Sequence, residues 1–457
     1  MLGVLTALGG CASYHAQPID PEASAKALQA RRLNDPDLIR FVTTDLHRPA
    51  APVRWDLDAL TAVAVYERPD MQIAAGQVAV ALAGEVTASS WPNPVLSLAP
   101  SYNVTRNYDI ESISPTISAI PASPWTVGPV VTQLLRTGGK RGADIAKAAA
   151  ETKAARAVIA VAAWQLRAEV RSALIGVWSA RRRLDLSRRH ASLSTEYTHA
   201  IEQRYRAGMI SAADLTAARL AQTQAALMLA ADERQAQIAS AGLANALGLP
   251  KDAIDGMAID WTALDHPPRP SGLAELRHRA LTSRPDVLAA LARYAAAQAS
   301  LRLAIADQYP DLSIGPGYEY SQNNNAFVLG IALPLPIFNQ NQGPIAAARA
   351  ARHVAAARFE QVQATALAQL ESAETDWHAS RREAERAREV LRLAADAEHQ
   401  EAVSFASGGA GRVRLLGAKV ARVEAELGVL SAALDERIAL GRLEDALHHP
   451  ILKTAGA

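Results

Sequence analysis

The sequence "ERPDMQIAAG" (Glu67–Gly76) returns later in the chain as "SRPDVLAALA" (Ser283–Ala292). Each copy places an Arg-Pro-Asp triplet before an Ala-rich run, and proline in the first turn is a common helix-entrance signal. Two more features recur in the same order, an aromatic-Pro pair at Trp91-Pro92 and Tyr309-Pro310, and a glycine step at Gly208 and Gly408. Their spacing of about 200 residues is far too long for a solenoid repeat. The chain is therefore predicted to hold two tandem halves, at about 56–266 and 267–457.

Each half ends in sequence typical of two long helices. No proline occurs between Pro129 and Pro250, or between Pro344 and Pro450. Both gaps are rich in Ala, Leu, Arg, Glu and Gln, and each is broken once, at its glycine step. They predict helical hairpins over about 142–247 and 344–447.

Small and apolar residues recur at spacings of three and four along the first helix of each hairpin. This pattern indicates either a coiled-coil seam or the core stripe of a helical bundle, and periodicity alone does not separate the two. The positions are Ile159, Ala163, Leu166, Val170, Ala173, Val177, Ala180 and Leu184 in the first half, and Ala366, Leu370, Ala373, Trp377, Ser380, Ala384, Ala387, Leu391 and Ala394 in the second.

The segments before these helices have a period of two, which predicts strands. In "PVLSLAPSYNVT" (Pro94–Thr105) and "DLSIGPGYEYS" (Asp311–Ser321), large apolar residues alternate with small or polar ones. A second strand follows each, so each half carries one β-hairpin, at about 93–136 and 311–336. The expected apolar face holds Leu96, Leu98, Tyr102, Leu312, Ile314 and Tyr318, and the expected polar face holds Ser97, Ser101, Ser313 and Glu319.

The N-terminal sequence "MLGVLTALGGCAS" (Met1–Ser13) is an apolar run in which Leu8-Gly9-Gly10 precedes Cys11. This is the pattern of a bacterial lipoprotein signal, and it predicts a signal peptide over 1–10 and a lipid-anchored segment over 11–55 with Cys11 as the attachment point. The basic stretch that opens such signals is missing, which indicates a truncated or misplaced start. The alternative is an ordinary buried cysteine. Beyond this leader the sequence shows no uninterrupted apolar stretch of the roughly 18 residues that a membrane helix needs.

Strands of about ten residues with one apolar face are typical of transmembrane β-barrels, although a half-exposed sheet covered by helices has the same pattern. Two matching hairpins in a chain with a lipoprotein-like N-terminus favour the barrel. Natural barrels start at about eight strands, so the four strands of one chain are too few and several copies must pool them. The longer tip of the first hairpin, 107–123, fits an outer-face loop, whereas the second hairpin turns over "QNNN" (322–325).

Composition argues against several other functions. The formal net charge is only +1, which is unsuited to a nucleic-acid partner. The histidines are scattered apart from His448-His449, and no HExxH or paired ligand spacing predicts a bound metal. Neither a phosphate-binding loop nor a nucleophile elbow is present. We therefore expect no enzyme activity, no cofactor and no resident metal.

With these features, the chain resembles the TolC-type outer membrane efflux proteins. The resemblance is carried by the two Arg-Pro-Asp triplets, by "YRAGMISAADLTAARLAQTQAAL" (Tyr205–Leu227) and by "LLRTGGKRG" (Leu134–Gly142), and the last is similar to the heavy-metal, cobalt-zinc-cadmium branch. The resemblance implies a mainly α chain with a membrane β-barrel, assembled as a homotrimer with twelve strands in the outer membrane and a helical barrel crossing the periplasm.

The resemblance also implies a passive export channel for heavy-metal cations or drugs. Its expected partners are a periplasmic adaptor (membrane fusion) protein, an inner-membrane pump of the resistance-nodulation-division type, and outer membrane lipids. The alternative function is a periplasmic helical adaptor or structural coiled-coil protein of an export system, which would leave both strand pairs without a role.

Two groups of residues are candidate sites. The glycine steps are expected to form the periplasmic tip, which closes the channel or contacts the adaptor, with Ser211 as a helix N-cap. Asp214 of the neighbouring tip is the carboxylate expected to pair with the arginines; the alternative is that the arginines point outward into solvent or toward the adaptor. The expected tip residues are Gly208, Ser211, Asp214, Leu215, Gly408, Arg412, Arg414 and Leu415. Lys140 and Arg141 lie at a helix start, where positive charge opposes the helix dipole, so they are expected either to reach lipid phosphates or to be solvated.

Overall fold

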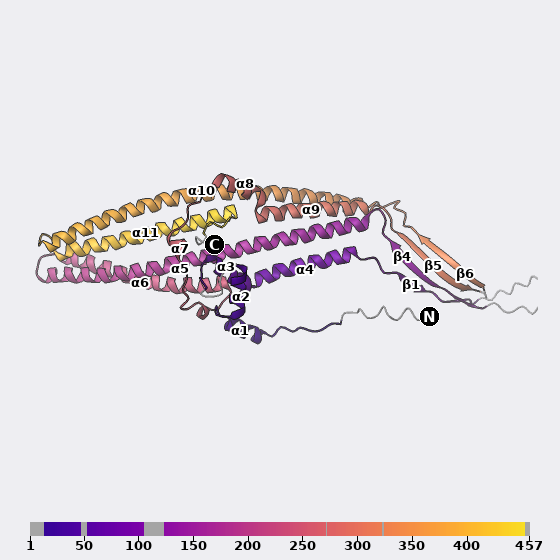
Figure 1. The fold of residues 1–457 in the computed structure, drawn as a ribbon, viewed down its shortest axis with the longest axis horizontal. Helices are drawn as coiled ribbons and strands as arrows, with labels where there is room; N and C mark the ends of the chain where they lie inside the picture. The colour runs from indigo at the N-terminus through magenta and orange to yellow at the C-terminus, as the bar shows by residue number, and fades with distance from the viewer. Residues whose placement is uncertain (1–12, 47–52, 105–122, 271, 322–323, 453–457) are drawn as a thin grey trace, which may run out of the picture.

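The computed structural model describes residues 13–46, 53–104, 123–270, 272–321 and 324–452. Cys11 and nearly all of the first hairpin tip lie outside these residues. The chain is long and narrow, with a sheet at one end and two helical turns at the other (Figure 1).

The helices are α1 (Pro21–Ala30), α2 (Pro36–Asp45), α3 (Leu57–Glu67), α4 (Pro69–Ser89), α5 (Lys140–Arg206), α6 (Ala212–Leu247), α7 (Thr262–Asp265), α8 (Leu273–Ser283), α9 (Pro285–Ala306), α10 (Gln342–Ala406) and α11 (Arg412–Leu447), with a 3-10 turn at Lys251–Ala253. The strands are β1 (Val95–Leu98), β2 (Ser101–Tyr102), β3 (Trp125–Val127), β4 (Pro129–Leu135), β5 (Leu312–Ser321) and β6 (Asn324–Ala332).

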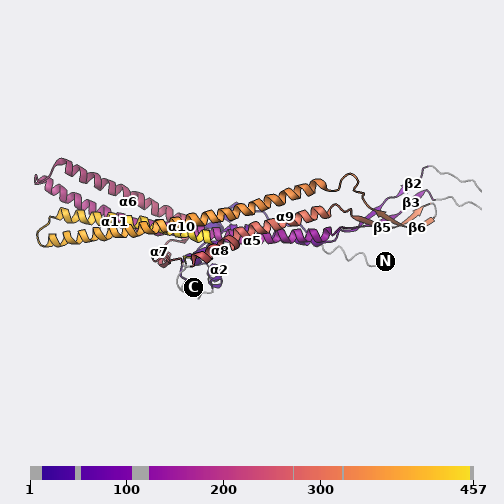
Figure 2. The same cartoon turned by 90° about the horizontal axis from the view of Figure 1, so that it is seen from above.

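The long helices form a wall one helix thick. α5 has 67 residues and α10 has 65, which confirms the predicted long-helix hairpins. α5 contacts α4 and α6 at one side and α9 and α11 at the other, and α10 contacts α9 and α11 (Figure 1). The two helical hairpins separate toward their tips in the second view (Figure 2). Among the described residues, α10 and α6 are the edge helices of the wall, and the side of each that faces away from the wall has no helical neighbour.

The core lies where the wall meets the small helices. Leu166, Val170 and Val177 of α5, with Leu370 and Trp377 of α10, belong to one buried cluster. The same cluster includes residues of α2, α3, α6 and α11. At this level of the molecule the seam is therefore a core stripe rather than a free coiled-coil seam.

The sheet joins the two halves. β1 pairs with β4, and β2 pairs with β3. Both β3 and β4 pair with one side of β5, and β6 pairs with its other side. All of these pairings are antiparallel. The expected hairpin strands are thus present. Among the described strands, β1, β2 and β6 are left at the edges of the sheet.

The pairing register places the predicted faces. Cross-strand partners share a face of the sheet, and neighbours along a strand alternate. Leu96 pairs with Val131, Ile314 pairs with both Gln133 and Ile331, and Tyr318 pairs with Phe327. One face therefore carries Leu96, Leu98, Tyr102, Trp125, Val127, Val131, Leu312, Ile314, Tyr318, Phe327, Leu329 and Ile331. The other carries Ser97, Ser101, Thr126, Thr132, Ser313, Glu319 and Ser321 beside glycines, alanines, a few valines and Leu134. The predicted alternation is confirmed for the residues that the sequence assigned to each face, although Gln133 lies on the apolar one.

Among the described residues one helix, α4, has the length and composition of a membrane span, with a mean hydropathy of 1.2. Ala and Val raise this average, although Gln72, Gln77 and Glu85 interrupt the run. In Figure 1 α4 lies lengthwise beside α5, which fits a wall helix.

Candidate functional site

The first helical tip is built as the sequence predicts. α5 ends at Arg206, Gly208 adopts a left-handed conformation (φ 69°), and α6 begins after Ser211. The Ser211 hydroxyl accepts a hydrogen bond from the Asp214 backbone N–H, and the Asp214 carboxylate accepts one from the Ser211 backbone N–H at 3.0 Å. Hydrogen bonds from the Ser211 hydroxyl and backbone N–H hold the pKa of Asp214 below its ordinary value. This reciprocal capping box fixes the start of α6.

The second tip lacks such a cap. Gly408 is also left-handed (φ 77°), but Gly411 precedes α11 and offers no side chain to its first turn. Arg412 and Arg414 therefore begin α11 at the positive end of its dipole, where cations are destabilising. Arg414 forms an ion pair with Glu401 of α10, and its Nη2 lies 2.5 Å from Glu401 Oε1.

Within the chain, Glu401 and not Asp214 pairs with Arg414, and the Asp214 carboxylate caps its own helix. Pairing of Asp214 with the arginines of a neighbouring tip stays a prediction. Glu401 and Arg414 lie at similar distances before and after the turn, on antiparallel helices, and this spacing is the signal that could have found the pair.

Although the two hairpins diverge toward their tips (Figure 2), they stay in contact there through one small apolar cluster. Leu215 packs with Ile201 and Ala218, and Val413 of α11 covers this small cluster. The structure therefore brings the first-half tip residues beside the start of α11. Leu415 is only half-buried, and its neighbour Leu416 is the buried position.

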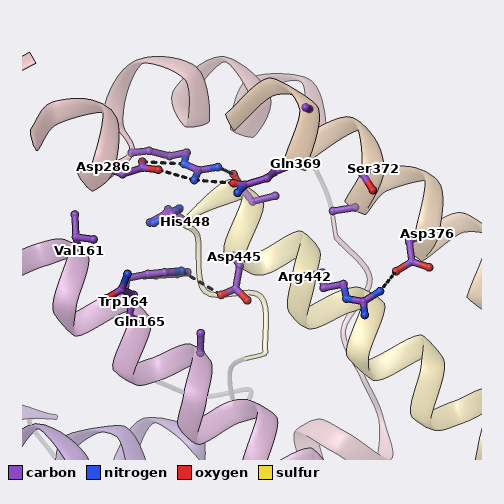
Figure 3. A pocket seen from close by; sticks show the side chains of 15 residues that line it. Val161, Trp164, Gln165, Asp286, Gln369, Ser372, Asp376, Arg442, Asp445 and His448 are labelled. Carbon is purple, nitrogen blue, oxygen red and sulfur yellow. Dashed lines mark hydrogen bonds and ion pairs between the residues drawn. The ribbon is translucent and has the colours of Figure 1, made fainter. Parts of the chain in front are cut away.

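The Arg-Pro-Asp triplets lie where the wall helices α4 and α9 begin, in the middle of the molecule. In the second half, Arg284 binds both oxygens of Asp286 (Figure 3). Its Nη1 also donates to the Ala446 carbonyl of α11 at 2.9 Å. In the first half, Arg68 binds Asp70 and Glu169. The Gly248 carbonyl at the end of α6 accepts a hydrogen bond from Arg31, not from Arg68. Only the second triplet therefore bonds the end of a wall helix directly, through Arg284, and in the first half Arg31 makes the corresponding bond to the end of α6.

A cavity of about 770 Å³ opens beside the second of these junctions. It is lined from α5, α9, α10 and α11 (Figure 3), and Ala373 of α10 belongs both to this lining and to the buried core. Among the described residues, no cluster of three or more His, Cys, Asp or Glu side chains is arranged to hold a metal.

His448 is the unusual residue of this junction. It ends α11 in a left-handed conformation (φ 47°), whereas the matching end of α6 has Gly248. Its ring stacks on Trp164, with centroids 4.9 Å apart, and the Trp164 indole N–H donates to Asp445. Burial, and then the nearby Arg284, lower the pKa of His448 below 6.5.

Acid should therefore loosen this junction through His448. The unfolded chain binds a proton on this histidine more readily than the folded chain does, so its contribution is intact above pH 6.5 and is lost as pH falls below that value. We expect His448→Gly to reduce the loss of thermal stability between pH 7.5 and pH 5, while relief of the left-handed strain offsets part of the lost stacking. The exposed His399→Gln serves as the control. An unchanged pH dependence in His448→Gly would show that His448 does not titrate in this way.

At the boundary between helices and sheet, the expectation for Lys140 is wrong. Its side chain is 9% exposed, and Nζ lies 2.9 Å from Asp311 Oδ1. Asp311 also accepts from the Thr137 backbone N–H, so this cluster ties the start of α5 to the start of β5. Lys140 is therefore not free for a lipid phosphate. Its partner is far away in sequence, and no local pattern indicated it.

Arg141 keeps its predicted position but has partners of its own. Nη2 donates to the Ser89 carbonyl at 2.6 Å, and the guanidinium lies 4.9 Å from the Trp91 ring centroid. The side chain is half-exposed, at the level where α4 passes into β1.

A one-layer helical wall joined to a sheet with one apolar, exposed face defines the fold of a membrane channel protomer. The chain superposes on VceC of Vibrio cholerae with a TM-score of 0.68 at 20% identity, covering 86% of this chain and 96% of that one. The outer-membrane channel OprN gives 0.67 at 19% identity over 97% and 99%, and the open-state MtrE channel of Neisseria gonorrhoeae gives 0.67 at 18% identity over 87% and 91%. These likenesses show the fold.

The family follows from the sequence. Residues 61–249 and 276–448 match the outer membrane efflux protein family, and the chain belongs to it. It is similar to the cobalt-zinc-cadmium resistance protein CzcC of Cupriavidus metallidurans, at 33% identity over 211 residues. That match spans 46% of this chain and about half the length of the relative, 50%.

Proposed function

We propose that this chain is the outer membrane channel of a tripartite efflux system. The observation that carries the proposal is the sheet, because most large side chains of its apolar face are exposed and one side of each edge strand, β1, β2 and β6, is unpaired among the described residues. In lipid, unpaired strand edges are costly, so copies of the chain must close the sheet into a barrel. A homotrimer would supply twelve strands and continue the helical wall across the periplasm.

The partners and the cargo belong to the same proposal. A passive channel needs an inner-membrane pump, here of the resistance-nodulation-division type, and a periplasmic adaptor that joins the two. The similarity to CzcC supports divalent heavy-metal cations as the cargo, rather than organic drugs. Removing the gene from its host should increase sensitivity to cobalt, zinc and cadmium, and the intact gene should restore resistance. Unchanged metal sensitivity with increased drug sensitivity would instead assign the channel to organic cargo.

The lipid anchor is a separate part of the proposal. Cys11 follows the Leu-Gly-Gly sequence and is the only cysteine of the chain. Metabolic labelling with a palmitate analogue should tag the protein and should fail for Cys11→Ser. Labelling that persists in this variant would remove Cys11 as the lipid attachment point.

The tips are proposed as the periplasmic aperture and adaptor contact. In a trimer, Arg412 and Arg414 would place six arginines near one axis, and the Glu401 pairs would hold three of them against repulsion. Because Lys140 pairs with Asp311, Arg141 alone of the two is proposed to contact lipid phosphates at the membrane interface.

Charge exchange at the second tip should alter ion flow. We expect Arg414→Glu and Glu401→Arg each to change single-channel conductance or ion preference in planar bilayers, because each leaves two like charges facing each other. The double exchange should partly restore the parent behaviour, and Arg412→Glu should shift preference toward cations. Arg386→Glu, on α10 away from the tip, is the control. If the tip variants all conduct like the parent while export continues, these residues do not line the aperture.

A further inference from the structure

The segment between β6 and α10 exposes more apolar surface than its position in a loop requires. Its sequence is Leu-Pro-Leu-Pro-Ile-Phe, Leu333–Phe338, and it is called the foot here. Leu335 and Ile337 are each 69% exposed, and Phe338 is 94% exposed. Loops that face water are usually polar, so a run of exposed large apolar side chains marks a contact surface.

The backbone of the foot suits a medium with little water. Pro334 and Pro336 have no backbone N–H, and the N–H of Ile337 donates to the Leu335 carbonyl at 2.8 Å. An unpaired donor is costly in an apolar environment, and the two prolines remove two donors from this segment. It can therefore leave the sheet without needing new strand partners.

The position of the foot fits the edge of a membrane. β6 has nine residues, enough for a tilted strand to cross the hydrocarbon core, and the foot follows its last residue, Ala332. Asn341, just after the foot, donates to the Ala304 carbonyl near the end of α9, which fixes the foot against the helical wall. Figure 1 shows the strands meeting the ends of the wall helices at this level.

The other passages between helices and sheet carry matching chemistry. Trp91, before β1, is 63% exposed and lies beneath the Arg141 guanidinium, and Tyr309, before β5, is also exposed. Trp and Tyr concentrate at membrane–water interfaces, and a basic side chain there can meet lipid phosphates. The repeated aromatic-Pro pair of the sequence therefore falls at the same boundary in both halves.

We propose that the foot, with Trp91 and Arg141, inserts into the glycerophospholipid headgroup layer on the periplasmic side of the membrane. This inference rests on the proposed channel function and adds a defined lipid-contact surface below the strands. Leu335, Ile337 and Phe338 reach the upper acyl chains, and Arg141 faces the phosphates. The foot thereby sets the depth at which the barrel stops and the helical wall begins.

Spin-label depth measurements test the proposal. In a Cys11→Ser background, Phe338→Cys carrying a nitroxide is reconstituted in vesicles of phosphatidylethanolamine and phosphatidylglycerol. We expect oxygen to relax this label more effectively than a water-soluble nickel chelate does. Leu329→Cys, on the apolar face of β6, is the positive control, and Val390→Cys, exposed on α10, is the aqueous control.

Each outcome is decisive. If the label at 338 behaves like the aqueous label at 390 while the label at 329 is in lipid, the foot does not insert into the headgroup layer. The proposed channel function would still stand. A label at 338 that neither agent reaches indicates cover by protein, and this also overturns the foot. If the labels at both 329 and 338 are in water, the barrel itself is wrong.

Discussion

Replacing Glu444 with alanine should destabilise the protein by about 3 to 5 kcal/mol, the cost of breaking a buried ion pair from one side. Glu444 is fully buried, and its Oε1 lies 2.9 Å from Arg167 Nε and 3.2 Å from Arg171 Nη1. Its Oε2 accepts the backbone N–H groups of Ile451 and Leu452. The change would leave two buried guanidinium groups short of a counter-charge and would release the segment after α11.

Thermal unfolding of the detergent-solubilised protein checks this result. Glu444→Gln, which keeps the side-chain volume and one acceptor, should lose less than Glu444→Ala. Glu385→Ala breaks only an exposed pair with Arg381 and should change stability by about 0.5 kcal/mol or less. If Glu444→Ala unfolds at the same temperature as Glu385→Ala, the buried network does not hold the middle of the molecule together.

Placing arginine at Ile314 should cost about 2 to 4 kcal/mol, the penalty for a cation at mid-membrane on the lipid face of a barrel. Ile314 lies in the centre of the apolar face, between Gln133 and Ile331. Ser313 is its neighbour on the opposite face, so Ser313→Arg should be tolerated. Folding into lipid vesicles, followed by denaturant titration, measures both variants. Equal tolerance at the two positions would mean that this face does not meet lipid.

Patterns with a short period were enough to predict most of the fold. The alternation around Leu96 and Ile314, the seam around Val170 and the cap at Ser211 each depend on neighbouring residues, and backbone geometry converts such patterns directly into structure. The duplicated Arg-Pro-Asp triplet likewise predicted two helix entrances. Its further task, in which Arg284 holds the carbonyl end of α11, depends on a residue distant in sequence and was not predicted.

Most of the features that were not predicted depend on contacts between residues far apart in the chain. Lys140 was expected at lipid because its local position is unfavourable, but Asp311 compensates for it. The pairing of Arg414 with Glu401, thirteen residues earlier on the other helix of the hairpin, was not predicted either. His448 was noted only for its neighbour His449. Its left-handed backbone and its stacking on Trp164 become visible only when α5 and α11 are in place.

The most direct test of the account is where the Cys11→Ser protein is found. A strand-built channel stays in the outer membrane without its lipid anchor, because the strands bury far more apolar surface than acyl chains do. We predict that this variant remains in the outer membrane fraction after an alkaline carbonate wash. Unheated, it should migrate in gels as a compact oligomer, and heating should convert it to the 48.5 kDa chain. Release of Cys11→Ser into the soluble periplasmic fraction as a monomer would contradict the channel and would favour a helical adaptor held to the membrane only by lipid.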